Sequence, residues 1–274
     1  MQTDMDSRRL EKRLKERFIK AVATYRLIED GDKILVGLSG GKDSLLLTKL
    51  LASRAKIQHP RYEVEAVHVR MENIHYESDY SYLQQFCDDL GIRLHIVTTR
   101  FDTATDSGPK PTAPLSSDPN TALSPQSVAL VSAALRRQKQ PCFLCSWNRR
   151  KQLFNLAQAL GFNKIALGHH QDDLIHTALM NLMFQGRFDT MPARLRMRKM
   201  PLSIIRPLCM IPEADIRAYA ETQGYQKQIK LCPYETDSHR TDIKRLYDDI
   251  ERINHEARYS IWNALNSSNK LIEE

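Results

Sequence analysis

The fold is decided by the stretch Lys33-Ile-Leu-Val-Gly-Leu-Ser-Gly-Gly-Lys-Asp-Ser-Leu-Leu-Leu-Thr-Lys-Leu50. Its apolar first part, residues 34–38, predicts a short buried strand, and the leucines from Leu45 onward predict a helix. Between them, Gly40 and Gly41 allow the backbone to turn sharply and to approach a ligand closely. The helix start directs free N–H groups and its positive dipole end into this turn, which therefore suits an anion and phosphate in particular.

The turn differs from the Walker A pattern, because Val36 stands where the first glycine of that pattern belongs and Asp43 where its Ser or Thr belongs. It resembles instead the pyrophosphate loop of the ATP pyrophosphatases, which use ATP to adenylate a substrate and release pyrophosphate. This resemblance implies an ATP site made of Ser39, Gly40, Gly41, Lys42, Asp43 and Ser44. A glycine-rich turn that binds no ligand is the plainer alternative.

The composition of the chain sets wide limits. Its 274 residues are enough for a complete α/β core, and 40 Lys and Arg against 33 Asp and Glu give a net charge of +7. This excess permits a polyanionic partner without requiring one. No apolar run is long enough to span a membrane, the N-terminus has no signal-peptide pattern, and the cysteine count of five is odd. We therefore expect a cytoplasmic protein in a reducing environment.

Beyond residue 50, strands alternate with helices. Strands are predicted at 64–69, 92–97, 164–167 and 203–208, with helices at 78–90, 142–160, 212–222 and one that ends near residue 184. Alternation of this kind indicates a doubly wound α/β fold, a parallel sheet with helices on both faces. Ligands of such sheets bind beyond the carboxyl ends of the strands, where the 39–44 turn is expected.

The remaining segments suggest a domain organisation. Residues 1–30 contain a basic helix whose charged face either contacts RNA phosphates or is simply solvated. Residues 31–225 form the nucleotide-binding domain, with a Pro-rich mobile insertion at 102–127. Residues 187–199 are rich in arginine and show little sign of a core. Residues 226–274 contain one long helix, whose apolar stripe is explained by core or dimer packing.

Two cysteines, Cys142 and Cys145, have the spacing of metal ligands or of a redox pair. Structural zinc would use Cys232 as a third ligand and Cys209 or a histidine as a fourth. A [4Fe–4S] cluster held by Cys142, Cys145 and Cys232 would leave one iron open, and the spacing alone does not choose between zinc and iron. Cys87, inside a predicted helix, is expected to be a buried core residue, and Cys209 is also expected to be structural.

Acidic and histidine side chains follow the fourth predicted strand in Gly168-His-His-Gln-Asp-Asp173. Asp172 and Asp173 at the edge of the sheet would hold Mg²⁺ on the phosphates of ATP, or would cap the next helix. A metal site that includes His176 is less favoured, because the stretch lacks the His-Glu-x-x-His pattern.

Taken together, these stretches resemble the tRNA-cytidine 2-sulfurtransferase family over nearly the whole chain. The motifs that carry the resemblance are 28–32 leading into the 39–44 turn, the cysteine pair followed by Arg149 and Arg150, the stretch 166–173, and Ile205-Arg-Pro-Leu208. The chain departs from the family in its longer Pro-rich insertion. It also has Ile229 where the partner of Cys232 in a second Cys-x-x-Cys would stand, which removes a spare cysteine rather than a presumed ligand. Related enzymes thiolate uridines instead of cytidine.

The resemblance implies a pyrophosphate-loop (adenine nucleotide alpha hydrolase-like) fold and ATP-dependent thiolation of tRNA. ATP would adenylate the C2 oxygen of an anticodon-loop cytidine, expected at position 32, and sulfur carried on a [4Fe–4S] cluster would replace that oxygen. The implied cofactors are the cluster and Mg²⁺, with ATP as cosubstrate, and a cysteine desulfurase would supply sulfur. The apolar stripe of the C-terminal helix also permits a homodimer.

Each site residue then has an expected role. The catalytic set is Lys42, Asp43, Asp172, Asp173 and Arg206; Gly168 and His169 join the ATP loop; Cys142, Cys145 and Cys232 hold the cluster; and RNA contacts come from Arg149, Arg150, Lys151, Arg194, Arg196 and Arg198. Alternatives are a 2-thiouridine synthetase, a lysidine synthetase, which needs no cluster, or a zinc-stabilised RNA-binding protein without catalysis.

Overall fold

The computed structural model describes residues 2–57, 59–72, 75–76, 80–100, 141–226, 230–231 and 239–273. The insertion predicted at 102–127 and the proposed ligand Cys232 lie outside this part of the chain, and the side chain of Cys142 is likewise not described.

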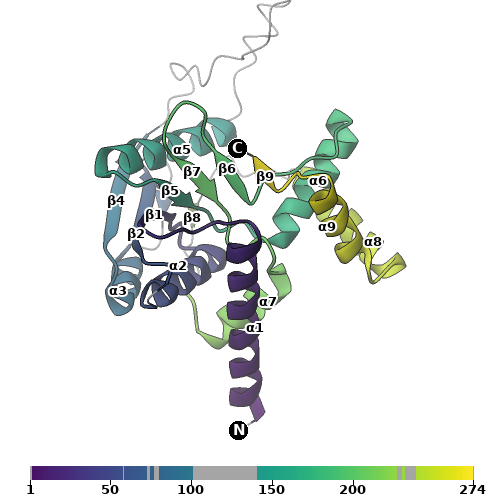
Figure 1. Cartoon of the computed structure of the whole chain (residues 1–274), viewed down its shortest axis with the longest axis horizontal. Helices are drawn as coiled ribbons and strands as arrows, with labels where there is room; N and C mark the ends of the chain where they lie inside the picture. Colours follow the sequence, from purple (N-terminus) through teal and green to yellow (C-terminus); the bar gives the residue numbers. More distant parts are fainter. Residues whose placement is uncertain are drawn as a thin grey trace, which may run out of the picture.

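A mostly parallel sheet forms the centre of the molecule, as the alternating pattern predicts (Figure 1). The seven strands in its described part have the order β4-β2-β1-β5-β7-β6-β9. Their bounds are β1 Asp32–Gly37, β2 Tyr62–Met71, β4 Leu94–Thr99, β5 Lys164–Ala166, β6 Arg194–Arg196, β7 Ser203–Ile205 and β9 Ile272–Glu273. All neighbouring pairs are parallel except β6 and β7, which form an antiparallel hairpin.

Helices cover both faces of this sheet. Their bounds are α1 Gln2–Thr24, α2 Lys42–Ala55, α3 Ser81–Leu90, α5 Pro141–Leu160, α6 Gln171–Gln185, α7 Glu213–Thr222, α8 His239–Ile253 and α9 Ala257–Ser267. The apolar side chains of α1, α2, α6 and α7 share one core with Ile34 and Val36 of β1, whereas α5 packs with Leu35 on the opposite face. The alternation of side chains along β1 therefore divides the core into two layers. Within the described chain, no helix is both long and apolar enough to cross a membrane.

The register of the strands brings three loops to one edge of the sheet. Val36 of β1 lies beside Ala166 of β5, and Ala166 lies beside Ile205 of β7. The segments that follow these residues, 38–44, 167–173 and 206–212, therefore leave the sheet at its carboxyl edge. The 197–202 turn of the β6–β7 hairpin lies at the opposite edge, because β6 is antiparallel and Arg196 lies beside Ser203 at the start of β7.

The structure corrects three local predictions. Residues 187–199 do contribute to the core, since they contain β6 and the fully buried Ala193. The long C-terminal helix is two helices, because the Asn254 side chain accepts a hydrogen bond from the Glu256 N–H (2.9 Å) and forms a turn between α8 and α9. As a result the apolar stripe predicted for one continuous helix is interrupted, and Ile253 at the end of α8 is 87% exposed.

Short strands that the pattern did not predict appear at two places. β9 carries the C-terminal segment back to the main sheet, where it pairs with β6. A separate antiparallel pair joins β3, His75–Tyr76, to β8, Lys230–Leu231. Strands of two or three residues have too few positions to show an alternating pattern, and tertiary contacts decide where they form.

Candidate functional site

The phosphate loop follows β1 and ends where α2 begins at Lys42. Gly40 has a φ of +86°, a conformation that glycine adopts at no steric cost. The hydroxyl of Ser44 accepts hydrogen bonds from the N–H and the Oγ of Ser39 (3.2 Å each) and donates one to the carbonyl oxygen of Gly41 (2.9 Å). The loop is thus held from inside by hydrogen bonds of its own serines.

Gly168, from the loop after β5, lies directly against this phosphate loop. A Cβ on Gly168 would lie 3.2 Å from the backbone carbon of Asp43 and 3.2 Å from the nitrogen of Ser44. Real Cβ atoms seldom approach other atoms that closely, so the start of α2 would have to shift. The predicted ATP-site residue Gly168 is therefore a glycine because the two loops pack backbone to backbone.

Lys42, the cation of the loop, lies between two carboxylates. Its ammonium is 3.2 Å from Oδ1 of Asp43 and 3.2 Å from Oε1 of Glu213, the first residue of α7. Burial disfavours the charged amine, but the two carboxylates outweigh it and raise the pKa of Lys42. Lys42 is therefore charged at neutral pH, as a phosphate ligand needs to be.

His170 lies between the carboxylates of Asp43 and Asp173. Its Nε2 is 3.9 Å from Oδ1 of Asp43 and 3.5 Å from Oδ2 of Asp173. Burial lowers the pKa of this imidazole, but Asp172, Asp173 and Asp43 together outweigh that effect and raise it. Asp173 also caps α6, since its Oδ2 accepts the backbone N–H of His170 (3.1 Å). The structure thus brings Asp43 and Asp173 to the same place, although they are far apart in the sequence.

Asp172 has different surroundings. Its Oδ1 accepts a hydrogen bond from Arg258 of α9 (2.8 Å), and its Oδ2 accepts one from the backbone N–H of Glu213 (2.7 Å). Burial favours the neutral acid, but His170, Arg258 and the Glu213 N–H outweigh it and hold the pKa of Asp172 far below its usual value. Both oxygens of Asp172 therefore join α6 to α7 and α9.

Arg206, at the end of β7, is buried beside His169. It donates hydrogen bonds from Nη1 to the carbonyl oxygen of Pro192 and from Nε to Nδ1 of His169 (3.3 Å). Burial and the charge of Arg206 lower the pKa of His169 to about 4, so this imidazole is neutral. Since its Nδ1 accepts a hydrogen bond, the proton of the neutral ring is on Nε2.

α5 brings the cysteine pair to the same edge. Gln152 of α5 donates to Oγ1 of Thr99, the last residue of β4 (3.3 Å). Burial and the charge of Arg150 lower the pKa of Arg206 to about 10. Cys145 is half-buried and lies five residues before Arg150, a little over one helical turn nearer the start of α5.

His68 of β2 is a buried histidine that contacts the residue preceding the phosphate loop. Its Nδ1 lies 2.8 Å from the carbonyl oxygen of Leu38, the residue that precedes the loop. Burial lowers the pKa of His68, and the charges of Arg149 and Arg70 lower it further.

Of the predicted metal ligands, only some belong to the described part of the chain. Among the residues that the structure describes, no three His, Cys, Asp or Glu side chains are grouped so that they could hold a metal ion. This finding does not extend to the predicted cluster ligands, because Cys232 and the Cys142 side chain lie outside the described part of the chain. β8 ends at Leu231, directly before Cys232, and is tied to β3, the strand that follows β2. The two buried cysteines Cys87 and Cys209 lie in the core, as predicted.

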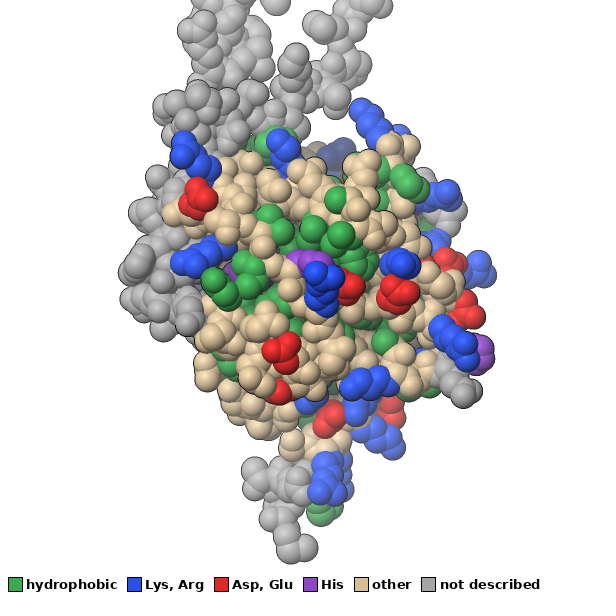
Figure 2. Space-filling model, turned by 90° about the vertical axis from the view of Figure 1, so that its left-hand side faces the viewer, with side chains coloured by type: hydrophobic (Ala, Val, Ile, Leu, Met, Phe, Trp, Pro, Cys, Tyr) green, Lys and Arg blue, Asp and Glu red, His purple; other side chains and the backbone are tan. Residues whose placement is uncertain are grey.

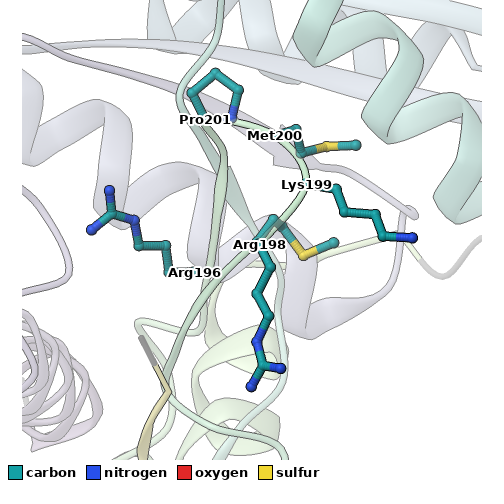
Figure 3. A pocket seen from close by; sticks show the side chains of 6 residues that line it. Arg196, Arg198, Lys199, Met200 and Pro201 are labelled. Atoms are coloured by element: carbon teal, nitrogen blue, oxygen red, sulfur yellow. The ribbon is translucent and has the colours of Figure 1, made fainter.

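The predicted RNA-contacting arginines divide between the two edges of the sheet. Arg196 and Arg198, with Lys199, line a hollow of about 590 Å³ at the hairpin turn, and Figure 3 shows their side chains spreading in different directions. This turn lies at the edge opposite the phosphate loop. Arg194 lies nearer the loop edge, beside Ile205. On the face shown in Figure 2, basic side chains are interspersed with acidic ones.

Several residues around the loop were not predicted from the sequence. Glu213, Lys244 and Arg258 belong to helices whose apolar spacing indicates only core packing, and His68 lies inside a buried strand. Among these residues, only His68 carried a signal in the sequence that could have predicted its place near the loop. A histidine buried in a strand that ends at the loop edge requires a polar partner.

Comparison with known proteins agrees with this geometry. A family model described as a PP-loop domain matches residues 7–112 and 147–230. The tRNA-cytidine(32) 2-sulfurtransferase of Saccharophagus degradans is 31% identical over 249 residues, 90% of this chain and 71% of the relative. That of Bordetella avium is 31% identical over 261 residues, 95% and 74% of the two chains. The solved U34-tRNA thiolase NcsA from Methanococcus maripaludis with its [4Fe-4S] cluster has a similar fold (TM-score 0.67, 24% identity, 95% of this chain and 79% of that chain).

Proposed function

The chain belongs to the tRNA-cytidine(32) 2-sulfurtransferase family of PP-loop proteins, and from this premise we propose that it catalyses ATP-dependent thiolation of a tRNA cytidine at C2. Two relatives named for that activity match this chain over 71% and 74% of their own length. The proposal extends to position 32 of the anticodon loop, to sulfur delivered by a cysteine desulfurase and to action in the cytoplasm.

One observation supports the proposal above all others. The phosphate loop and the end of α5 that carries the cysteine pair lie at the same carboxyl edge, since Gln152 of α5 bonds Thr99 at the end of β4 and β4 is parallel to β2 and β1. An enzyme that activates a base with ATP and then replaces its oxygen with sulfur needs both chemistries within reach of one atom. An ATPase without thiolation would have no use for thiols at this edge.

The loop residues supply the first half of the reaction. The free N–H groups at the start of α2 and the charged Lys42 bind the phosphates of ATP. Arg206, buried beside His169, offsets the negative charge that develops as the cytidine C2 oxygen bonds to the α-phosphorus and pyrophosphate leaves. The C2 oxygen then departs with AMP when sulfur bonds to C2.

The carboxylates at the loop fit a magnesium ion. Asp43 Oδ1 is buried and, apart from its ion pair with Lys42, has no hydrogen-bond partner among the described residues, and both Asp43 and Asp173 lie beside the shared neighbour His170. Carboxylate oxygens are the ligands that Mg²⁺ prefers, and the ion would offset the negative charge of the phosphates. We assign this role to Asp43 and Asp173, because both oxygens of Asp172 are engaged with α7 and α9.

The cysteine pair fits an iron–sulfur cluster in its chemistry. Cys142 and Cys145 are three residues apart at the start of α5, a spacing typical of residues that share one side of a helix. Cys232 follows β8 and would complete a set of three thiolates. A [4Fe–4S] cluster bound there would supply the iron to which the incoming sulfur is attached.

The decisive experiment measures metal content and product together. We expect anaerobically purified protein to contain about four irons with sulfide per chain, and to convert tRNA cytidine to 2-thiocytidine while releasing AMP and pyrophosphate. Cys142→Ala, Cys145→Ala and Cys232→Ala should each lose the cluster and thiolation. Cys87→Ala is the matched control and should keep both, since Cys87 is buried in α3 away from the edge.

The other outcomes separate the alternatives. Zinc at one per chain without a thiolated product would favour an RNA-binding protein. A full cluster with 2-thiouridine would keep the mechanism and overturn the cytidine assignment. A lysidine product without a cluster would contradict the role of the cysteines.

A further inference from the structure

Lys244 of α8 lies near the phosphate loop, because Glu213 of α7 contacts both Lys244 and Lys42. Its ammonium donates a hydrogen bond to Oε2 of Glu213 (2.9 Å), while Lys42 lies 3.2 Å from the other oxygen, Oε1. One carboxylate therefore holds two lysines from opposite ends of the chain, one of them the cation of the loop. The matched family domain ends at residue 230, so Lys244 lies beyond it.

The position of Glu213 is itself fixed by the surrounding helices. Its backbone N–H is bonded to Asp172, which is held by Arg258 of α9. Its carboxylate stays ionised, because Lys244 and Lys42 outweigh the effect of burial and lower the pKa of Glu213 to about 2. The carboxylate is thus a fixed and permanently charged support for the two lysines.

The positive charges around Glu213 outnumber the negative ones. Besides the two lysines, Arg217 approaches Oε1 to 3.3 Å, so three cations surround this carboxylate, and Asp43 is the other acidic partner of Lys42. Lys42 and Arg217 would already neutralise Glu213 without Lys244. The side chain of Lys244 is 45% exposed, and an ammonium has three donors, so it can bond a further anion while it stays on Glu213.

We propose that Lys244 binds the polyphosphate of ATP together with Lys42, and that Glu213 is the positioning residue that holds the two lysines side by side. Arg217 does not take this role, because α7 runs away from the loop edge: Gln223, just beyond its end, bonds Lys49, which lies well along α2. The inference deepens the proposed function, on which it rests, by assigning part of the ATP site to the C-terminal helices.

Calorimetry with ATP and Mg²⁺, and separately with inorganic pyrophosphate, tests the assignment. Lys244→Met should weaken both affinities by about tenfold, the usual size for one charge-assisted hydrogen bond. Arg245→Met is the matched control, since Arg245 is the next residue of α8, has the same charge and is exposed. It should change neither affinity by more than about twofold. Lys244→Gln is a second neutral variant, should Lys244→Met lower the melting temperature.

A double variant separates phosphate binding from simple neutralisation of Glu213. If Lys244 only balances Glu213, then Glu213→Gln together with Lys244→Met should restore wild-type affinity for pyrophosphate, and the inference is overturned. We expect the double variant to stay as weak as Lys244→Met or weaker.

Failure of the inference differs from failure of the proposed function. If the wild type binds ATP and Lys42→Met loses it, but Lys244→Met behaves like Arg245→Met, only the role of Lys244 is wrong. If the wild type binds neither ATP nor pyrophosphate, the proposed function fails, and the inference fails with it.

Discussion

At the scale of single residues, the site depends on side chains whose surroundings decide their role. Asp172 and Asp173 are neighbours in sequence, yet both oxygens of one join three helices, while the other lies beside Asp43 at the loop. His169 and His170 are also neighbours. Arg206 and burial lower the pKa of the first, whereas three carboxylates raise that of the second. The two members of each pair therefore have different surroundings, although they are neighbours in the sequence.

Gly168 gives a prediction at this scale. Gly168→Ala should raise the KM for ATP about tenfold, because its Cβ would press on the backbone of Asp43 and Ser44 and move the N–H groups that bind phosphate. Steady-state pyrophosphate release measures the effect. Gly37→Ala is the control, since its Cβ would meet the end of the Leu167 side chain (3.3 Å), which can rotate away. Equal KM values for the two variants would contradict the proposed close packing.

At the scale of elements, the junction of α6, α7 and α9 is organised by one buried carboxylate. Asp172 accepts the first N–H of α7 and pairs with Arg258, which also donates to Glu251 of α8 (3.0 Å). The start of α7 is thus satisfied by a side chain of another helix rather than by its own cap. The C-terminal helices α8 and α9 are attached to the nucleotide-binding core through this contact, and they lie beside α6 in Figure 1.

Asp172→Asn should therefore lower the free energy of unfolding by about 3 kcal/mol, because it leaves Arg258 without its buried partner. Chemical denaturation at neutral pH measures this loss. Asp248→Asn, an exposed change on α8, is the control and should stay within about 0.5 kcal/mol of the wild type.

The same variant should also change the pH dependence of stability. The pKa of Asp172 is lowered by folding, so its contribution is present above the unfolded pKa and is lost as the pH falls towards the folded value. The stability difference between wild type and Asp172→Asn should be constant above about pH 5 and shrink below about pH 4. A difference that stays constant down to pH 3 would show that Asp172 does not act through its charge.

At the scale of the whole molecule, the two edges of the sheet have different roles. The carboxyl edge carries the phosphate loop, the carboxylates, Arg206 and the start of α5, whereas the hairpin turn with Arg196 and Arg198 lies at the other edge. A tRNA is large enough to contact both edges, but only groups at the carboxyl edge can orient the target base. The basic face of α1 is partly used within the protein, since Arg13 and Arg17 both pair with Asp215 of α7.

Salt dependence should distinguish the two edges. Replacing Arg149 and Arg150 with Ala should reduce the slope of log affinity for tRNA against log salt by about 1.5, the value for two phosphate contacts, and should also lower kcat. Replacing Arg196 and Arg198 with Ala should reduce the slope while kcat stays at the wild-type value. Filter binding at several salt concentrations and single-turnover thiolation check this. An unchanged slope in both variants would assign these arginines to a solvated face.

By itself, the sequence determined the elements whose signal is local. The strand at 34–38, the turn at 39–44 and the helix after it are specified by neighbouring residues, since apolar runs, glycines and a helix start act over a few positions. The alternating order of strands and helices then determined the parallel sheet and the edge at which the loops meet. The phosphate loop and the cysteine pair could therefore be identified without coordinates.

Only the tertiary structure decided which distant groups meet at that edge. Nothing local in Glu213 or Lys244 marks them as neighbours of Lys42, and nothing in Asp172 shows that Arg258, 86 residues away, holds it. The division between Asp172 and Asp173 likewise depends on where α7 and α9 pack. The physical reason is range: hydrogen bonds and ion pairs act over a few ångströms in space, and folding brings together residues that sequence periodicity cannot relate.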